Sequence, residues 1–339
     1  MRTLAIVFGI CLAAEFIVCN EITASPVQAA FFSSYGRRVF FEMQPGVNPL
    51  MRTPKAGPYN ERLGYSYLPF YIKALQGDGF SVVAQMRASD TYTKLAKRGL
   101  YPIYHPKTVA GLTLYDRAGE KIYAASYPNH VYADFEAVPP LLVKTLLFIE
   151  NRRLFGEGAV TRNPVIEWGR LLHAMFGQVI RLFDPHYNPG GGSTLATQIE
   201  KFRFSPQGKT GSGVEKLRQI VSASLRVYLD GPDTREARKN IVLDYLNSTP
   251  LSARPSFGEI NSIGDGLWAW FGMDLGAASG VLNLDEENEG LLKSKAHVYR
   301  ATLGLILAQR RPSYYLQTNR VALDGLIDAT LDRLANAGV

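Results

Sequence analysis

The sequence predicts a mainly α-helical protein with a small mixed α/β module in front of its helical part. Apolar residues recur at helical spacing over most of the chain after Pro139. Before that point, residues 68–75 read as a short helix and residues 80–86 alternate like a strand. The first residues are apolar behind a single positive charge. We therefore expect four parts: an N-terminal signal or anchor (1–20), an accessory α/β segment (21–109), a main helical domain (110–316) and a C-terminal helix (317–339).

The composition is that of a globular chain with a basic excess. Its 339 residues are 46% hydrophobic and 20% charged, which is enough for one large domain or two smaller ones. A formal net charge of +7 favours anionic lipid, phosphorylated substrates or nucleic acid as partners. The chain has no run of five Lys or Arg residues, which argues against a nucleic-acid-binding tail. A scattered, solvated basic face is the plain alternative.

The N-terminus has the order of an export signal. Arg2 precedes the apolar stretch Thr3–Cys19, which is near the lower length limit for crossing roughly 30 Å of hydrocarbon. Val27-Gln28-Ala29 offers a small-residue cleavage site, a retained signal-anchor fits the same stretch, and a buried core helix is a third reading. Both cysteines, Cys11 and Cys19, lie here, so no disulfide or cysteine metal site is expected beyond it.

The segments that follow are expected in this order. Residues 21–60 are rich in proline and read as an extended lead-in. Asp116-Arg117-Ala118-Gly119 reads as a turn that joins strands 112–115 and 121–125 into a hairpin. Pro139-Pro140 opens a helix that ends near residue 150.

Later helices carry their own start signals. Asn163-Pro164 reads as an N-cap followed by proline at the first helical position. Asp233 with Glu236 is typical of a capping box. Two more helices are expected over residues 297–310 and 319–335.

Glu150 and Asn151, at the end of an apolar helix, are the first candidates for chemistry. A carboxylate beside a hydrophobic surface is suited to acid–base work on sugars. A solvated residue at a helix end is the plain alternative.

The second candidate is the loop Gly190–Thr194, followed by a helical stretch that contains Lys201. Its glycines let the backbone approach a ligand, and the hydroxyls and free N–H groups at a helix start suit a phosphate or pyrophosphate. It is not a nucleotide P-loop, because Arg203 stands where the first glycine of the downstream Gly208-Lys209-Thr210 would be needed. A flexible linker is the alternative.

The apolar stretch 171–183 is the third candidate. It reads either as a core helix or as a helix in a membrane interface, with Arg170 and Arg181 directed to lipid phosphates. The five histidines show no metal-binding spacing, and no Gly-x-Ser-x-Gly motif is present. A zinc site and a hydrolase triad therefore have no support.

The order of these segments resembles the glycosyltransferase module of peptidoglycan polymerases over residues 111–316. Glu150–Leu154 is similar to the family's Glu-Asp-x-x-Phe, and Gly191–Lys201 to its Gly-Gly-Ser-Thr-x-Thr-Gln-Gln-x-x-Lys. Glu215–Gln219 stands for its Arg-Lys-x-x-Glu. The remaining family motifs resemble Ile241–Asn247, Trp270-Phe271-Gly272 and Pro312–Tyr315.

This resemblance implies a lysozyme-like helical fold and an activity. The reaction would join lipid II units into β-1,4 glycan strands and release the lipid pyrophosphate. Glu150 would be the general base, and Gln219 stands at the place of a second catalytic carboxylate. The substrate would be held by Asn151, Arg170, Gly192, Ser193, Thr194, Gln198, Lys201, Lys216 and Asn247.

The resemblance also implies partners and a location. Lipid II, the growing glycan strand, membrane lipids and other cell-wall synthesis proteins are expected partners, and nucleic acid is not. The catalytic domain is expected on the periplasmic face of a bacterial inner membrane. No cofactor is firmly implied, and a divalent cation, Mg or Mn, held with the pyrophosphate is the candidate.

Departures from the family pattern leave other functions open. Asn151 replaces an Asp and Gln219 a Glu, and losing one such electrostatic group costs about 10²–10³ in rate. Glu200 or Glu215 would have to compensate. A non-catalytic binder of lipid-linked precursor or of cell-wall partners is the main alternative. A lysozyme-like hydrolase needs a second carboxylate roughly 5–9.5 Å from Glu150.

Overall fold

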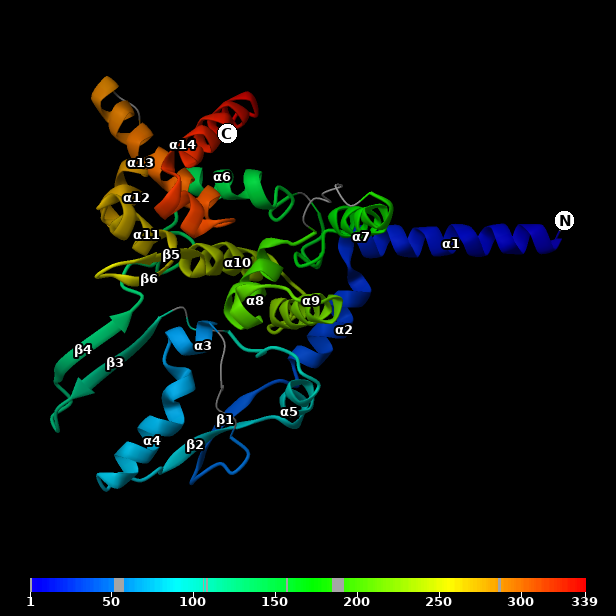
Figure 1. Cartoon of the computed structure of the whole chain (residues 1–339). Helices are drawn as coiled ribbons and strands as arrows, with labels where there is room; N and C mark the ends of the chain where they lie inside the picture. The colour runs from blue at the N-terminus through cyan, green and yellow to red at the C-terminus, as the bar shows by residue number, and fades with distance from the viewer. Residues whose placement is uncertain are drawn as a thin grey trace.

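The computed structural model describes residues 2–51, 58–105, 107, 109–156, 158–184, 192–285 and 288–339. The described chain is mainly helical, which confirms the predicted fold class (Figure 1). The helices are α1 (Arg2–Ala24), α2 (Pro26–Gly36), α3 (Pro58–Arg62), α4 (Leu68–Gly77), α5 (Asp90–Lys97), α6 (Pro140–Glu150), α7 (Trp168–Phe183), α8 (Leu195–Phe204), α9 (Gly213–Val227), α10 (Arg235–Ser248), α11 (Ile263–Gly266), α12 (Leu275–Asn283), α13 (Glu289–Ala308) and α14 (Arg320–Asn336), with single turns at Tyr65–Tyr67, Pro206–Gly208, Leu267–Phe271 and Tyr314–Thr318. The strands form three antiparallel pairs, β1 (Phe41–Pro45) with β2 (Ala84–Ala88), β3 (Ala110–Tyr115) with β4 (Lys121–Tyr127), and β5 (Pro250–Arg254) with β6 (Gly258–Asn261).

Helix α1 projects away from the body of the protein (Figure 1). Its residues 7–24 are long and apolar enough to cross a membrane, with a mean hydropathy of 1.7. The carboxylate of Glu21 accepts hydrogen bonds from the N–H groups of Val27 and Gln28 and so caps α2. The expected extended lead-in is therefore wrong over residues 26–36, because α2 buries Ala29 in the main core.

The accessory module has a small core of its own. Strands β1 and β2 pair from Phe41 opposite Ala88 to Pro45 opposite Ala84. Its cluster of buried residues joins the module to α9 and consists of Val39, Leu95, Ile103 and Leu225.

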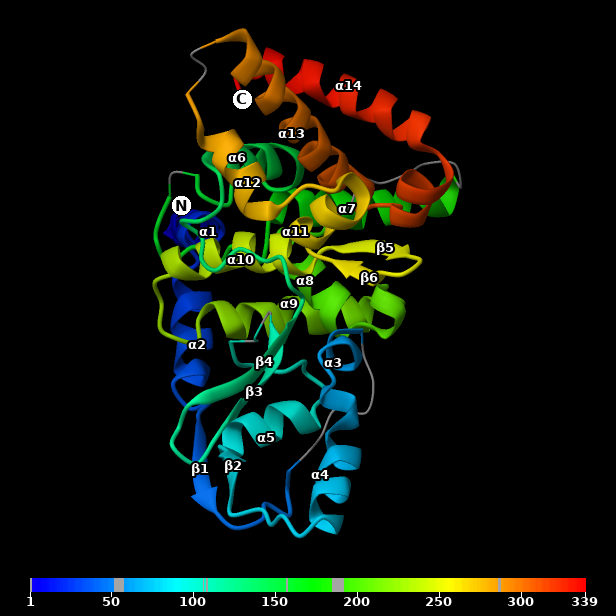
Figure 2. The ribbon, with the colours of Figure 1, turned by 90° about the vertical axis from the view of Figure 1, so that its left-hand side faces the viewer.

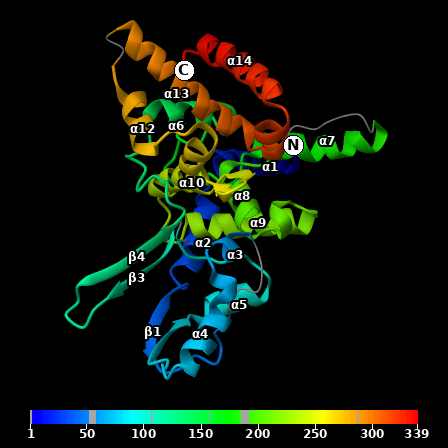
Figure 3. The same cartoon turned by 60° about the vertical axis from the view of Figure 1, so that its left-hand side comes forward.

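The predicted hairpin is confirmed as β3 and β4, which extend from the body (Figure 3). Its turn forms because Asp116 Oδ1 accepts from the N–H groups of Ala118 and Glu120, and Gly119 supplies the positive φ of 85°.

The main core gathers the apolar faces of α6, α8, α10 and α13, with fully buried residues such as Leu142, Leu195, Leu246 and Leu305. The helices expected after Pro139 and over residues 297–310 and 319–335 are confirmed as α6, α13 and α14. The strand pair β5–β6 was not expected in this helical part.

One expected helix start is wrong, and another is displaced by one residue. Asn163 begins no helix, because its side-chain N–H group donates to Gln28 and Ser224 and its Oδ1 accepts from Val165 N. Asp233 instead pairs with Arg235, and α10 begins after Thr234.

Candidate active site

The carboxylate of Glu150 is buried at the end of α6. Leu142 and Leu146 are fully buried on this helix, and Glu150 is the next residue at the i+4 spacing of that same face. Its relative exposure is 5%, so the acid is carried into the protein by the apolar stripe. Asn151 follows as the C-cap and is also buried, and among the described residues its Oδ1 has no hydrogen-bond partner.

Both oxygens of this carboxylate accept hydrogen bonds from groups far away in the sequence. Gln198 Nε2 on α8 donates to Glu150 Oε2 at 3.1 Å. Arg310, in the turn after α13, donates from its guanidinium to Glu150 Oε1 at 3.1 Å. A buried charge needs such partners because it has lost its contacts with water. The 61% exposed side chain of Arg310 thus lies on the solvent side of a buried acid.

Arg170 supports the same helix end from α7. Its guanidinium donates to the main-chain oxygen of Glu150 at 2.5 Å, and its Nε lies 3.9 Å from Glu167 Oε2. The last carbonyls of a helix lack partners within it and carry partial negative charge, so a cation stabilises them. Arg170 therefore fixes the position of Glu150.

The predicted phosphate loop leads into α8 through a capping box. Thr194 Oγ1 accepts from Thr197 N, and Thr197 Oγ1 accepts from Thr194 N at 3.0 Å. The Thr194 hydroxyl also donates to the Val165 carbonyl at 2.8 Å, so it serves the loop itself. Gly192 packs against α7, where an added Cβ would lie 2.9 Å from Ala174 Cβ. Gly190 and Gly191 lie outside the described residues.

Three cations gather beside this loop. Lys216 Nζ donates to Ser193 Oγ at 2.8 Å and to Thr197 Oγ1 at 3.3 Å. Burial, and then the charges of Lys201 and Arg170, lower the pKa of Lys216 to about 8. Burial also lowers the pKa of Lys201, while the nearby charge of Glu150 acts in the opposite direction. Cations held this close together with little water favour an anionic ligand.

Two of the predicted residues are engaged elsewhere. Gln219 is fully buried, and its Nε2 donates to Ser205 Oγ and Thr210 Oγ1, each at 2.9 Å. Asn247 uses its amide to hold both main-chain groups of Tyr132, at 2.9 Å and 2.8 Å. Among the hydrogen bonds of the described residues, none links either side chain to Glu150.

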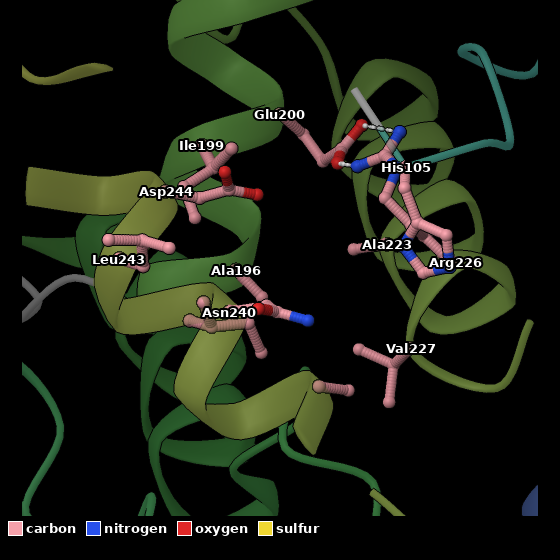
Figure 4. Close-up of a pocket in the computed structure, with 12 residues that line it drawn as sticks. His105, Ala196, Ile199, Glu200, Ala223, Arg226, Val227, Asn240, Leu243 and Asp244 are labelled. Carbon is pink, nitrogen blue, oxygen red and sulfur yellow. Dashed lines mark hydrogen bonds and ion pairs between the residues drawn. The ribbon is translucent and has the colours of Figure 1, made fainter. Parts of the chain in front are cut away.

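The carboxylates proposed to compensate for Gln219 also have other partners. Glu200 is on the opposite side of α8 from Gln198 and forms a buried ion pair with Arg226. The two side chains meet beside a separate pocket of about 250 Å³, which Asp244 also lines (Figure 4). Glu215 accepts hydrogen bonds from Tyr101 Oη and Gly211 N.

Sequence reasoning missed two residues next to Glu150. Arg310 is one of them, and the motif Pro312–Tyr315 that follows it was the only signal nearby. Tyr245 is the other. Its hydroxyl is completely buried, and its pKa is raised by desolvation and then by the charge of Glu150. In the part of the chain that the structure describes, this hydroxyl has no hydrogen-bond partner.

Glu150 and Arg170 also line a larger pocket of about 510 Å³. Its walls come from the end of α1, the end of α6, the first turn of α7 and α14. No group of three or more His, Cys, Asp or Glu side chains is placed to hold a metal ion within the described ranges.

Comparison with protein families gives one match, which covers about half of the chain. Residues 118–291 match the family described as Transglycosylase, a segment that contains Glu150, Gln198 and the three cations. No similar protein was found among curated proteins. The chain therefore belongs to the transglycosylase family and carries a glycosyl-transferring domain of the peptidoglycan glycosyltransferase type.

Proposed function

We propose that this protein polymerises lipid II into β-1,4 glycan strands with Glu150 as the general base. The observation that carries the proposal is a buried carboxylate beside a group of cations. Gln198 holds Glu150 directly, and Lys201 lies on the same face of α8 as Gln198. Acid–base chemistry and stabilisation of a departing phosphate are thus available in one place.

The proposed reaction uses the acid and the cations in separate roles. The 4-hydroxyl of the acceptor sugar attacks the anomeric carbon of the donor while the Glu150 carboxylate takes its proton. The bond between that carbon and the pyrophosphate oxygen breaks, and its electrons leave with the pyrophosphate. Lys201, Lys216 and Arg170 offset the negative charge that develops there. A Mg or Mn ion held with the pyrophosphate would neutralise part of the same negative charge.

Other predicted residues would shape the site without taking part in the chemical step. Thr194 and Gly192 shape the loop, and Ser193 is held by Lys216. Arg310 covers Glu150 from the solvent side, so it must move aside or turn toward the acceptor before the sugar reaches the base. Asn151 ends the helix that carries Glu150, and Asn247 holds the main chain of Tyr132.

The membrane is expected on the side from which α1 projects. Helix α7 lies across the direction of α1: Figure 1 shows α1 lengthwise and α7 foreshortened, and Figure 2 shows the reverse. Among the α7 side chains that the structure describes, the exposed large apolar ones are Leu172, Phe176, Ile180 and Phe183. Such a helix suits the plane of a bilayer that α1 crosses, and it would bring the site to a lipid-linked substrate on the periplasmic face of the inner membrane.

The test is polymerisation of labelled lipid II by the full chain in detergent or bilayers. Glu150→Gln should lose activity about 10²–10⁴-fold, as expected when a general base is removed. Glu259→Gln, which makes the same change at an exposed position, should retain it. Equal polymer yields from the two variants would reject Glu150 as the base.

A non-catalytic binder of the same precursor is the second candidate, favoured by the neutral Gln219. It predicts that the wild type binds lipid II without forming polymer. In that case Gln219→Glu should restore polymerisation, and failure to do so would show that position 219 is not the cause.

A further inference from the structure

The pocket of about 510 Å³ beside Glu150 has an excess of positive charge. It is lined by five arginines, Arg152, Arg153, Arg162, Arg170 and Arg333, and by two carboxylates, Glu150 and Glu167. Both acids already face arginines, since Glu150 pairs with Arg310 and Glu167 lies near Arg170. The pocket as a whole therefore attracts an anion.

Neutral groups hold several of these arginines in place. Arg152 Nε donates to the Phe148 carbonyl at 3.1 Å, and its guanidinium stacks over the Phe148 ring at 3.9 Å. Arg162 donates to the main-chain oxygen of Arg153 at 2.6 Å. Within the described ranges, no carboxylate pairs with Arg152, Arg153, Arg162 or Arg333. A guanidinium has five N–H donors, so these contacts leave donors for a ligand.

The pocket lies where α1 leaves the body of the protein. Ile22 of α1 lines it, two residues before the end of the segment that can cross a membrane. The loop that carries Arg162 is fastened there, since Thr161 Oγ1 donates to the Ala24 carbonyl at 2.7 Å. The first turn of α7 supplies Trp168, a residue type that favours the membrane–water boundary. With α1 crossing the bilayer as proposed above, the pocket would lie near the level of the lipid phosphates.

Apolar side chains complete the walls. Ile22, Phe148, Ile149 and Ile166 line the pocket together with the arginines. A soluble phosphate would gain nothing from such surfaces, whereas a lipid would place its glycerol and first acyl carbons against them.

We propose that this pocket binds the phosphodiester headgroup of an anionic phospholipid, with Arg162 and Arg333 among its ligands. Guanidinium groups bind phosphate oxygens through paired, charge-assisted hydrogen bonds. Arg333 belongs to α14, beyond the segment that matches the transglycosylase family. The site would hold the catalytic domain against the bilayer, next to the acid of the reaction. The proposal rests on the membrane side inferred above and does not depend on glycosyl transfer.

The test measures lipid binding by the full chain in neutral detergent. Short-chain phosphatidylglycerol is titrated while Trp168 fluorescence is followed, and Trp168→Phe identifies the reporter. Arg162→Gln and Arg333→Gln should each weaken binding about tenfold. Arg320→Gln makes the same charge change on α14 outside the pocket and should bind like the wild type.

Two controls separate the possible sources of a signal. Short-chain phosphatidylcholine should bind far more weakly, and inorganic phosphate should compete only at much higher concentration. Equal affinity for the two lipids, or wild-type binding by both pocket variants, would overturn the proposal. Competition by inorganic phosphate at the lipid's own concentration would do the same, because it would assign the pocket to a soluble anion. Loss of polymerisation alone has no bearing on this result.

Discussion

Replacing Lys216 with arginine tests whether its charge serves the reaction. The pKa of Lys216 is lowered to about 8, first by burial and then by Lys201 and Arg170. In the free enzyme this charge is lost as the pH rises through that value, and roughly nine-tenths of it is gone one unit higher. Arginine stays protonated throughout this range. The Lys216→Arg variant therefore keeps a positive charge at this position above pH 8, where the wild type loses it.

If protonated Lys216 holds the departing pyrophosphate, kcat/KM for lipid II should fall about tenfold per pH unit above about pH 8 in the wild type. Bound pyrophosphate favours the charged lysine, so kcat should decline only at higher pH. Lys216→Arg should keep kcat/KM nearly constant over the same range. Lys239→Arg, at a surface ion pair, should behave like the wild type.

The assay is initial-rate polymerisation across the pH range, with folding checked by circular dichroism at each pH. An unchanged decline of kcat/KM in Lys216→Arg would refute the assignment and point to Lys201, whose pKa is also lowered by burial. The pH dependence of folding stability should be opposite to that of kcat/KM. Unfolded Lys216 binds its proton more tightly than the folded residue does, so the free energy of unfolding rises with pH between about 8 and 10.5, the ordinary pKa of a lysine.

Two further predictions concern stability and are measured by chemical denaturation. Gly192→Ala should lower the free energy of unfolding by about 1–3 kcal/mol, because the new Cβ lies 2.9 Å from Ala174 Cβ. Gly169→Ala should leave the free energy of unfolding unchanged, because its new Cβ would have no atom within 4 Å. Equal losses of stability in the two variants would contradict the packing argument. Arg226→Leu should cost about 3–5 kcal/mol, since it leaves Glu200 buried without its cation. Burial raises the pKa of Glu200, so this loss should shrink as the pH falls; a pH-independent loss would reject the cause.

Sequence patterns correctly predicted the turns and helix ends that are stabilised by residues within the same short segment. The turn Asp116–Gly119 is closed by its own side chain, and Pro139-Pro140 needs only the fixed φ of proline to begin α6. Asn163 failed as a helix start for the opposite reason. Its amide bonds Gln28 and Ser224, and a single sequence does not show that these segments meet.

The residues of the candidate site likewise fall into those that a local sequence motif predicted and those that only the fold brings together. Glu150 and Gln198 were selected by motif, and the structure brings them together at 3.1 Å. The apolar helix that ends at Glu150 was predicted, whereas the burial of its carboxylate on the face of Leu142 and Leu146 is seen only in the structure. Arg310 was missed because it reaches Glu150 from a turn 160 residues later, and nothing in its neighbours' spacing indicates that contact.

The hydrogen bonds around Gln219 determine whether Gln219→Glu is a useful test of the missing second carboxylate. Its Nε2 donates to the hydroxyls of Ser205 and Thr210, and its Oε1 has no partner among the described residues. Hydroxyl groups accept and donate, so both can turn and donate to a carboxylate instead. Tyr101 Oη reaches the same Ser205 and can complete the network. Glu215 shares Tyr101 with this network, so folding of Gln219→Glu is checked first by circular dichroism. A variant that keeps the wild-type spectrum will report on the charge rather than on damage to the core.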